Sequence, residues 1–221
     1  MTMMYNYQEQ ANIQAFLEDE KYADRHSVLK TISQLFEANH IKWALACSSP
    51  LFFLGIQDDF HDFDVLVAPE DAEKADELLQ SIGEKENPEL NPARTRYFDD
   101  DYFGKFKIDG VPLDVISEFG VQTFGTCYKY HFVAEQIEKI KICRGLIVPA
   151  IPLEAQFILY TMMTGWQPQR RFKKELIGNF LKTNGLNHKE VFEDALCNHS
   201  LPYWAKAEIR DLLESENIID D

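Results

Sequence analysis

Two aspartates separated by one residue, Asp62 and Asp64, open the apolar run in the segment FHDFDVLV. Alternate residues of a β-strand project to one face, so both carboxylates can lie on the same side while Phe63, Val65 and Val67 face a core. Two neighbouring carboxylates that are partly removed from water are costly unless a cation neutralises them or one is protonated. The segment therefore predicts a strand that begins at a charged site.

A third acid, Asp114, interrupts an apolar run that follows a turn signal. The dipeptide Asp109-Gly110 lies between the alternating segments YFGKFKI and VPLDVIS, and Asp-Gly is typical of a two-residue hairpin turn. If the strand of Asp114 lies beside that of Asp62 and Asp64, the three carboxylates can hold two metal ions about 3.5–4 Å apart. Oxygen ligands of this kind suit magnesium or manganese. The alternative is a set of solvated acids at a junction of loop and strand, because D-x-D is a common tripeptide.

The periodicity of the rest of the chain predicts an α+β fold. We expect two helices at the start, over 8–19 and 24–39, then a strand over 41–49 and a short helix over 50–56. After the strand of the two aspartates, an amphipathic pattern predicts a helix that ends at Gly83. Strand candidates follow at 94–98, 102–108 and 111–117, with another hairpin around Arg144-Gly145, and the pattern is helical from Pro152 onward. We predict an α+β domain over 1–150, with a helical lead-in over 1–40, and a helical region over 151–221.

Composition narrows the class of partner. The 221 residues include 37 acids against 22 bases, which gives a formal charge of -15. A surface of this charge repels phosphate backbones, so nucleic acid is not the expected partner. Four cysteines without a C-x-x-C pair argue against a zinc knuckle and a disulfide framework. No apolar run approaches the ~20 residues that span a bilayer, and the start has no secretory pattern, so we expect a cytoplasmic protein that does not enter a membrane.

The order of these motifs resembles the nucleotidyltransferase-fold superfamily, which includes DNA polymerase beta, the lincosamide and aminoglycoside nucleotidyltransferases and small bacterial antitoxins. The pattern of that superfamily is an apolar residue, a glycine, and a glycine or serine, with D-x-D about a dozen residues later. In the stretch ACSSPLFFLGIQDDFHDFDVLV, Ala46 takes the apolar place, Cys47 the place of the glycine and Ser48 the third place. Asp62 and Asp64 match the D-x-D pair. The resemblance covers about residues 41 to 117 and implies a mixed β-sheet with flanking helices and a C-terminal helical extension.

The resemblance also implies an activity and a set of site residues. Asp62, Asp64 and Asp114 would be the catalytic acids and would bind Mg²⁺ or Mn²⁺, which bridges the phosphates of an NTP. Asp114 would also help to deprotonate the acceptor hydroxyl. Ser48, with Ser49 beside it, would hold the β- and γ-phosphates. The expected reaction is the transfer of an NMP from NTP to a hydroxyl of a small molecule or a protein, catalysed by positioning and charge neutralisation.

Two basic segments are candidates for phosphate contacts. Arg94 and Arg96 alternate on a predicted strand, and they either bind the triphosphate or pair with the acids at 99–101. The cluster RRFKK at 170–174 either folds over the sheet to hold phosphate or forms a solvated helix face with Phe172 in the buried stripe.

The sequence departs from the superfamily pattern at two places. Cys47 replaces a glycine that allows the backbone to approach phosphate closely. The arginine that often precedes D-x-D is absent, and Asp58 and Asp59 lie there instead. These departures leave a second hypothesis open, in which the chain has lost catalysis and binds a nucleotide or a protein partner, as an antitoxin-like component would.

Overall fold

The computed structural model describes residues 7–86 and 97–216. The central element is a seven-stranded mixed sheet with the strand order β3-β4-β5-β2-β1-β9-β8, and a separate two-stranded sheet is formed by β6 and β7. The strands are β1 Trp43–Ala46, β2 Phe63–Val67, β3 Glu84–Lys85, β4 Tyr102–Ile108, β5 Val111–Ser117, β6 Phe119–Thr123, β7 Thr126–Tyr130, β8 Glu138–Cys143 and β9 Leu146–Ala150.

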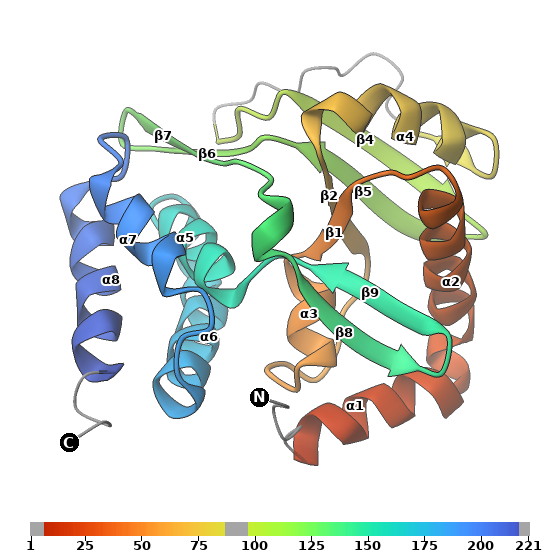
Figure 1. Ribbon diagram of the computed structural model, residues 1–221, viewed down its shortest axis with the longest axis horizontal. Coiled ribbons are helices and arrows are strands. Elements are labelled where there is room, and N and C mark those ends of the chain that lie inside the picture. The colour runs from red at the N-terminus through yellow and green to blue at the C-terminus, as the bar shows by residue number, and fades with distance from the viewer. Residues whose placement is uncertain (1–6, 87–96, 217–221) are drawn as a thin grey trace.

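Helices from the N-terminal part and from the C-terminal part of the chain flank the sheet (Figure 1). The N-terminal part contributes α1 Tyr7–Glu18, α2 Ala23–Ala38, α3 Ser48–Phe53 and α4 Ala72–Gln80, and the C-terminal part contributes α5 Leu153–Met163, α6 Arg171–Asn184, α7 Lys189–Cys197 and α8 Tyr203–Glu216. Short 3-10 turns occur at Glu20–Tyr22, Pro69–Asp71, Ala134–Gln136 and Pro168–Arg170. The architecture is α+β, as the sequence predicts. No helix among the described residues is long and apolar enough to cross a membrane.

Each face of the sheet supplies one hydrophobic core. Trp43 and Leu45 of β1 pack in a core with side chains of α1, α2 and α4, whereas Ala44 and Ala46 pack in a second core with side chains of α5 to α8. The alternation follows from the two-residue period of the strand. In Figure 1 the C-terminal helices lie on one side of the sheet and α2 and α4 on the other. The predicted boundary at residue 150 falls between β9 and α5, and the division into two domains stays a prediction.

The predicted hairpin at Asp109-Gly110 is present. These two residues have φ angles of 47° and 82°, and they connect Ile108 to Val111, which pair across β4 and β5. Positive φ at both turn positions is the geometry that suits the right-handed twist of the strands. The second expected hairpin is also present, because β8 and β9 pair on either side of Arg144-Gly145.

Three expectations differ from the structure in detail. The predicted strand over 41–49 is shorter, because β1 ends at Ala46 and Ser48 begins α3. Of the strand candidate at 94–98, the residues up to 96 lie outside the described part, and Phe98 forms a single bridge with Val121. The β6–β7 hairpin was not predicted, because the two residues at its turn, Phe124-Gly125, do not form a typical turn dipeptide.

Candidate functional site

The three candidate acids line one pocket of about 340 Å³. The pocket lies at the end of β1 and extends from the central sheet to the C-terminal helices. Its described lining residues are Cys47, Ser48, Asp62, Asp64, Phe98, Asp100, Phe103, Lys105, Asp114, Ile116, Phe119, Met163 and Arg170. The fold thus brings together carboxylates from separate stretches of the chain and places basic residues beside them.

Strand pairing explains why the acids meet. Strands β2 and β5 run parallel, and their register places Asp64 directly beside Asp114. On its other side, Asp64 pairs with Ala46, the last residue of β1. Asp62 precedes β2 by one residue, and it shares the orientation of Asp64 because side chains alternate along the strand. The sequence predicted this meeting only on the condition that the two strands were neighbours, and β2 and β5 are neighbours.

Burial of two of these acids, Asp64 and Asp114, raises the pKa of both carboxyls. Burial, and then the negative charges of Asp62 and Asp114, raise the pKa of the Asp64 carboxyl to about 8. Burial also raises the pKa of Asp114 to about 6, although the nearby ammonium of Lys105 opposes the change. Carboxyls with raised pKa values in a polar pocket are typical of sites that bind a cation or handle a proton.

The donor chemistry of the pocket suits a divalent cation. Three carboxylates offer the hard oxygen ligands that Mg²⁺ and Mn²⁺ prefer, and a cation would remove the repulsion that raises the pKa of Asp64. Over residues 7–86 and 97–216, however, no group of three His, Cys, Asp or Glu side chains is already close enough to hold an ion.

Lys173 of α6 reaches this site from the C-terminal helices. Its Nζ donates a hydrogen bond to Ser48 Oγ at 2.5 Å, across 125 residues of sequence. Burial lowers the pKa of the Lys173 ammonium below its ordinary value. Arg170, at the start of the same segment, lines the pocket, and its Nε donates to Gln167 Oε1 at 2.8 Å. The sequence marked the RRFKK cluster as basic, but it could not select these two members.

The rest of the RRFKK cluster has other surroundings. Lys174 forms an ion pair with Glu208 of α8 at 2.5 Å, and Arg171 is exposed. The alternative in which the cluster forms a solvated helix face put Phe172 in a buried stripe, but 65% of its surface is exposed, so that placement is wrong. Residues 172 and 173 are about 100° apart around the helix axis, so when Lys173 points to the pocket Phe172 points to solvent.

Cys47 lies in a backbone conformation that favours glycine. Its φ and ψ are 57° and -120°, a combination that L-residues with a Cβ rarely adopt. Burial, reinforced by the negative charge of Asp64, raises the pKa of the Cys47 thiol. The thiol is therefore protonated and poorly reactive at neutral pH. Cys47 thus combines a backbone conformation that favours glycine with a side chain that lines the pocket.

Several other candidates lie apart from the pocket or outside the described residues. Arg94 and Arg96 lie outside the described residues. Ser49 is fully buried and does not line the pocket. Asp59 accepts a hydrogen bond from Tyr22 Oη at 2.7 Å and pairs with Lys21 at 3.7 Å. Asp59 is therefore engaged with the N-terminal helices, and part of the negative charge that precedes D-x-D is neutralised there.

From the sequence, Asp100 was only one of the run of acids at 99–101 and was not selected as a site residue. It is almost fully buried, and Gly120 N donates a hydrogen bond to its Oδ1 at 3.0 Å. A Cβ at Gly120 would lie 2.3 Å from Asp99 O, so only glycine allows the two backbones to approach this closely. Burial raises the pKa of Asp100 to about 7. Asp100 thus adds a fourth carboxyl to the pocket.

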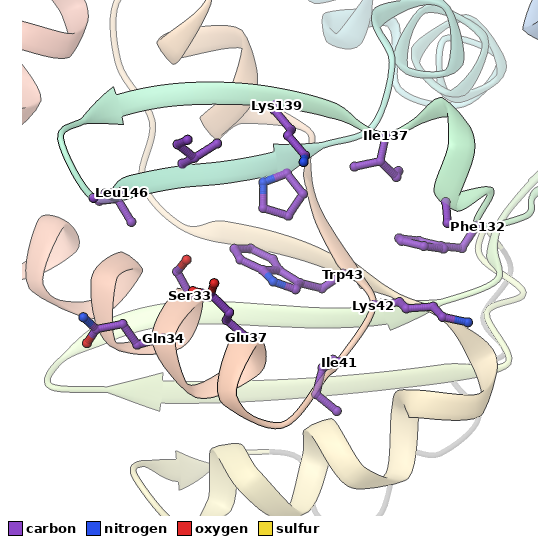
Figure 2. Close-up of a pocket in the computed structure, with 14 residues that line it drawn as sticks. Ser33, Gln34, Glu37, Ile41, Lys42, Trp43, Phe132, Ile137, Lys139 and Leu146 are labelled. Carbon is purple, nitrogen blue, oxygen red and sulfur yellow. The ribbon is translucent and has the colours of Figure 1, made fainter.

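A larger hollow, of about 550 Å³, lies at the opposite end of β1 (Figure 2). Trp43, Phe132 and Ile137 give it a largely apolar wall, and Glu37 of α2 and Lys139 of β8 lie on opposite sides. It has none of the three candidate acids among its described lining residues. The candidate catalytic acids therefore line the smaller pocket and not this hollow.

Comparison with known proteins identifies the fold. No family model matches the chain, and no curated protein matches its sequence. A presumed nucleotidyltransferase from Thermotoga maritima has a similar structure, with a TM-score of 0.56 and 18% identity over 69% of this chain and 92% of its own. The antibiotic-resistance factor ANT(2'')-Ia, an aminoglycoside nucleotidyltransferase, has a TM-score of 0.51 and 12% identity over 89% of this chain and 98% of its own.

Proposed function

We infer that this protein, which has the nucleotidyltransferase fold, transfers an NMP from NTP to a hydroxyl group. Mg²⁺ or Mn²⁺ would be its cofactor. The observation that carries this proposal is the register of β2 and β5, which sets Asp64 beside Asp114 in a pocket that also contains Asp62. Lys105 and Arg170 also line this pocket, and basic groups of this kind favour the binding of an anionic triphosphate.

In the proposed mechanism, Asp62, Asp64 and Asp114 would hold the cation. When bound, the cation would neutralise charge on the triphosphate and on the leaving pyrophosphate. Lys173 and Arg170 would bind the β- and γ-phosphates from the side of α6, and Ser48 would hold a phosphate oxygen through its hydroxyl. Lys173 already contacts Ser48, so the same two groups can both face one phosphate.

Asp114 is the residue we propose as the base. Its pKa is raised to about 6, so at neutral pH it is mostly ionised and can still accept a proton. The acceptor hydroxyl would lose its proton to Asp114 as its oxygen forms a bond to the α-phosphorus. The bond from the α-phosphorus to the bridging oxygen would break, and pyrophosphate would leave.

The first test is the thermal stability of the protein with each NTP, with and without Mg²⁺ or Mn²⁺. A ligand at 100 times its dissociation constant should add about 2.7 kcal/mol to the free energy of unfolding. The double variant Asp62→Ala/Asp64→Ala should lose the metal-dependent part of this shift. Incubation with α-labelled NTP and candidate acceptors, including the protein itself, should then give a labelled product. The enzyme assignment fails if no NTP stabilises the wild-type protein under any of these conditions.

A second candidate function is nucleotide or partner binding without transfer. The observation that favours it is Cys47, whose side chain lies where the superfamily pattern has glycine and shares the pocket with Asp64. NTP-dependent stabilisation without labelled product, for any acceptor tested, would support this second function over the first.

A further inference from the structure

Besides the pocket of the aspartates and the hollow of Figure 2, the structure contains a cavity of about 370 Å³, which we call the second cavity. Its described lining residues are Tyr97, Gln122, Thr123, Phe124, Gly125, Gly165 and Trp166. They come from the turn of the β6–β7 hairpin, from the segment that follows α5, and from the residues before β4. In Figure 1 this hairpin extends from the central sheet over the C-terminal helices.

Phe98 and Trp166 connect the two cavities. Phe98 lines the pocket of the aspartates, and its ring meets the Trp166 ring edge to face at a centroid distance of 5.3 Å. Met163 lines the first pocket, while Gly165 and Trp166, two and three residues later, line the second. The Phe98–Trp166 pair thus lies between the lining of the second cavity and the pocket of the carboxylates.

The wall of the second cavity is aromatic. Tyr97 and Trp166 are stacked with ring centroids 4.1 Å apart. Phe124 is 78% exposed and has a φ of 45°, at a turn position where Asn, Asp or Gly is expected and a bulky residue is an outlier. Its ring meets the Trp204 ring edge to face at a centroid distance of 6.5 Å, and most of its surface stays open to solvent. A largely exposed aromatic ring at a strained turn position is a feature of ligand-binding surfaces.

The cavity also has hydrogen-bonding groups that the described part of the protein does not use. Thr123 is 5% exposed, and its Oγ1 and the Trp166 Nε1 are buried without a hydrogen-bond partner among the described residues. None of the described lining residues is charged. Aromatic faces combined with a few neutral polar groups suit a neutral ring compound with hydroxyl groups, and they suit neither a polycation nor a phosphorylated molecule.

We propose that this cavity is the acceptor subsite, and that it takes a neutral, hydroxylated ring compound, either an aromatic alcohol or a sugar. This inference rests on the proposed nucleotidyl transfer. The ring would lie against Phe124 and the Tyr97–Trp166 pair, and its hydroxyls would bond to Thr123 and Trp166. A further hydroxyl extends past Phe98 towards Asp114, loses its proton there, and forms the bond to the α-phosphorus as pyrophosphate leaves.

The test measures binding of defined probes to the full-length protein without NTP, by saturation-transfer difference NMR. The probes are phenyl β-D-glucoside, methyl β-D-glucoside, benzyl alcohol and the polycationic kanamycin. We expect phenyl β-D-glucoside to bind most tightly and kanamycin to show no saturable binding. The two simpler probes distinguish a sugar site from an aromatic site by which of them retains affinity.

Three variants test whether the probe binds in the second cavity. Phe124→Asn removes the ring and places a residue that tolerates positive φ in the turn, so it should fold at least as well as wild type and weaken binding at least fivefold. Trp166→Phe keeps a ring but removes the N–H donor, and it should weaken binding of the hydroxylated probes about fivefold or more. Phe172→Asn removes an exposed ring outside both cavities and should leave binding unchanged.

The same proteins are then titrated with NTP and Mn²⁺. Equal probe binding by wild type and Phe124→Asn, no probe binding by wild type, or tighter binding of kanamycin than of phenyl β-D-glucoside would overturn the acceptor subsite even where NTP binds normally. Loss of probe binding in Phe124→Asn together with normal NTP stabilisation supports it. Probe binding at this cavity in a protein that no NTP stabilises would instead refute the proposed transfer and, with it, the acceptor role of the site.

Discussion

At the scale of one residue, Cys47 combines a backbone conformation that favours glycine with a side chain that lines the candidate site. Its φ of 57° and ψ of -120° belong to a region that costs about 1–3 kcal/mol for a residue with a Cβ. The sequence places a cysteine where the pattern that it resembles has glycine. The structure adds that the backbone at Cys47 adopts a conformation that favours glycine.

We predict that Cys47→Gly does not destabilise the protein and tightens NTP binding. Glycine removes the strain at positive φ, although it adds entropy to the unfolded chain, so the net change in unfolding free energy should lie between zero and about +1 kcal/mol. Removal of the side chain also allows closer approach of a phosphate. Cys47→Ala is the matched control, because it removes the thiol but keeps the Cβ and its strain. Urea denaturation and NTP titration measure the two effects, and similar behaviour of both variants would contradict the role given to the backbone.

A second prediction concerns Asp64 and the pH dependence of stability without metal. The pKa of this carboxyl rises from an ordinary 3.8 to about 8 on folding. Between these values the folded protein keeps a proton that the unfolded chain has lost, so stability falls as the pH rises from about 4 to about 8. Asp64→Asn should therefore stabilise the chelator-treated protein by on the order of 2–4 kcal/mol at pH 8.5, and by almost nothing near pH 4.

Thermal unfolding from pH 4 to 9 with a chelator tests this expectation. A constant difference between Asp64→Asn and wild type across the pH range would show that Asp64 is not held protonated by burial and by its acidic neighbours. Adding Mn²⁺ should reduce the difference at high pH, because a cation stabilises the ionised carboxylates.

At the scale of one element, α6 links the candidate site to the helical bundle. Adjacent lysines on this helix have different partners, because Lys173 donates to Ser48 and Lys174 pairs with Glu208. Successive residues of a helix point about 100° apart, so one helix can serve both the site and the packing of α8.

We predict that Lys173→Ala weakens NTP binding about ten- to a hundredfold, because a charge-assisted hydrogen bond contributes roughly 1.5–3 kcal/mol. Lys174→Ala should leave NTP affinity within about twofold of wild type and lower the unfolding free energy by about 1 kcal/mol, since its ion pair is partly buried. Calorimetric titration with NTP and Mn²⁺, together with thermal unfolding, separates the two variants. Equal NTP affinities of the two variants would show that Lys173 does not contribute to NTP binding.

At the scale of the whole molecule, the central sheet belongs to two cores at once. The residues of β1 alternate between a core with α1, α2 and α4 and a core with α5 to α8. The candidate site lies where these parts meet, since its acids are on the sheet and Lys173 is on α6. Loss of the C-terminal helices would therefore expose the apolar residues Ala44, Ala46, Leu66 and Ile116 of the sheet.

We predict that both cores unfold in a single transition. Trp43 lies in the first core, and Trp166 and Trp204 pack against the second, so W43F and the double variant W166F/W204F each report on one core. Phe192→Ala removes a fully buried ring of the second core and should lower the unfolding free energy by about 3–5 kcal/mol. The denaturation midpoint of Phe192→Ala should shift by the same amount whether it is followed by the tryptophan of the first core or by those of the second. Two separate transitions would instead support independent domains over 1–150 and 151–221.

The sequence by itself determined most of the helices and strands, and it singled out the three acids as candidates. A two-residue period around Asp64 and Asp114, the Asp109-Gly110 turn, and helical spacing after Pro152 are local signals, because each depends on interactions within a few residues. The same kind of signal failed for β6 and β7, where an aromatic residue, Phe124, occupies a turn position. Arg94 and Arg96 stay predictions, since they lie outside the described residues.

Only the tertiary structure decided which strands are neighbours and which basic residues reach the acids. The pairing of Asp64 with Asp114 depends on a parallel contact between β2 and β5, and many strand orders are compatible with the same local pattern. Lys173 meets Ser48 across 125 residues, because packing of α5 and α6 against the second face of the sheet brings them together. The apolar faces are visible in the sequence as periodic patterns, but which faces pack against one another depends on the whole chain and leaves no local signal.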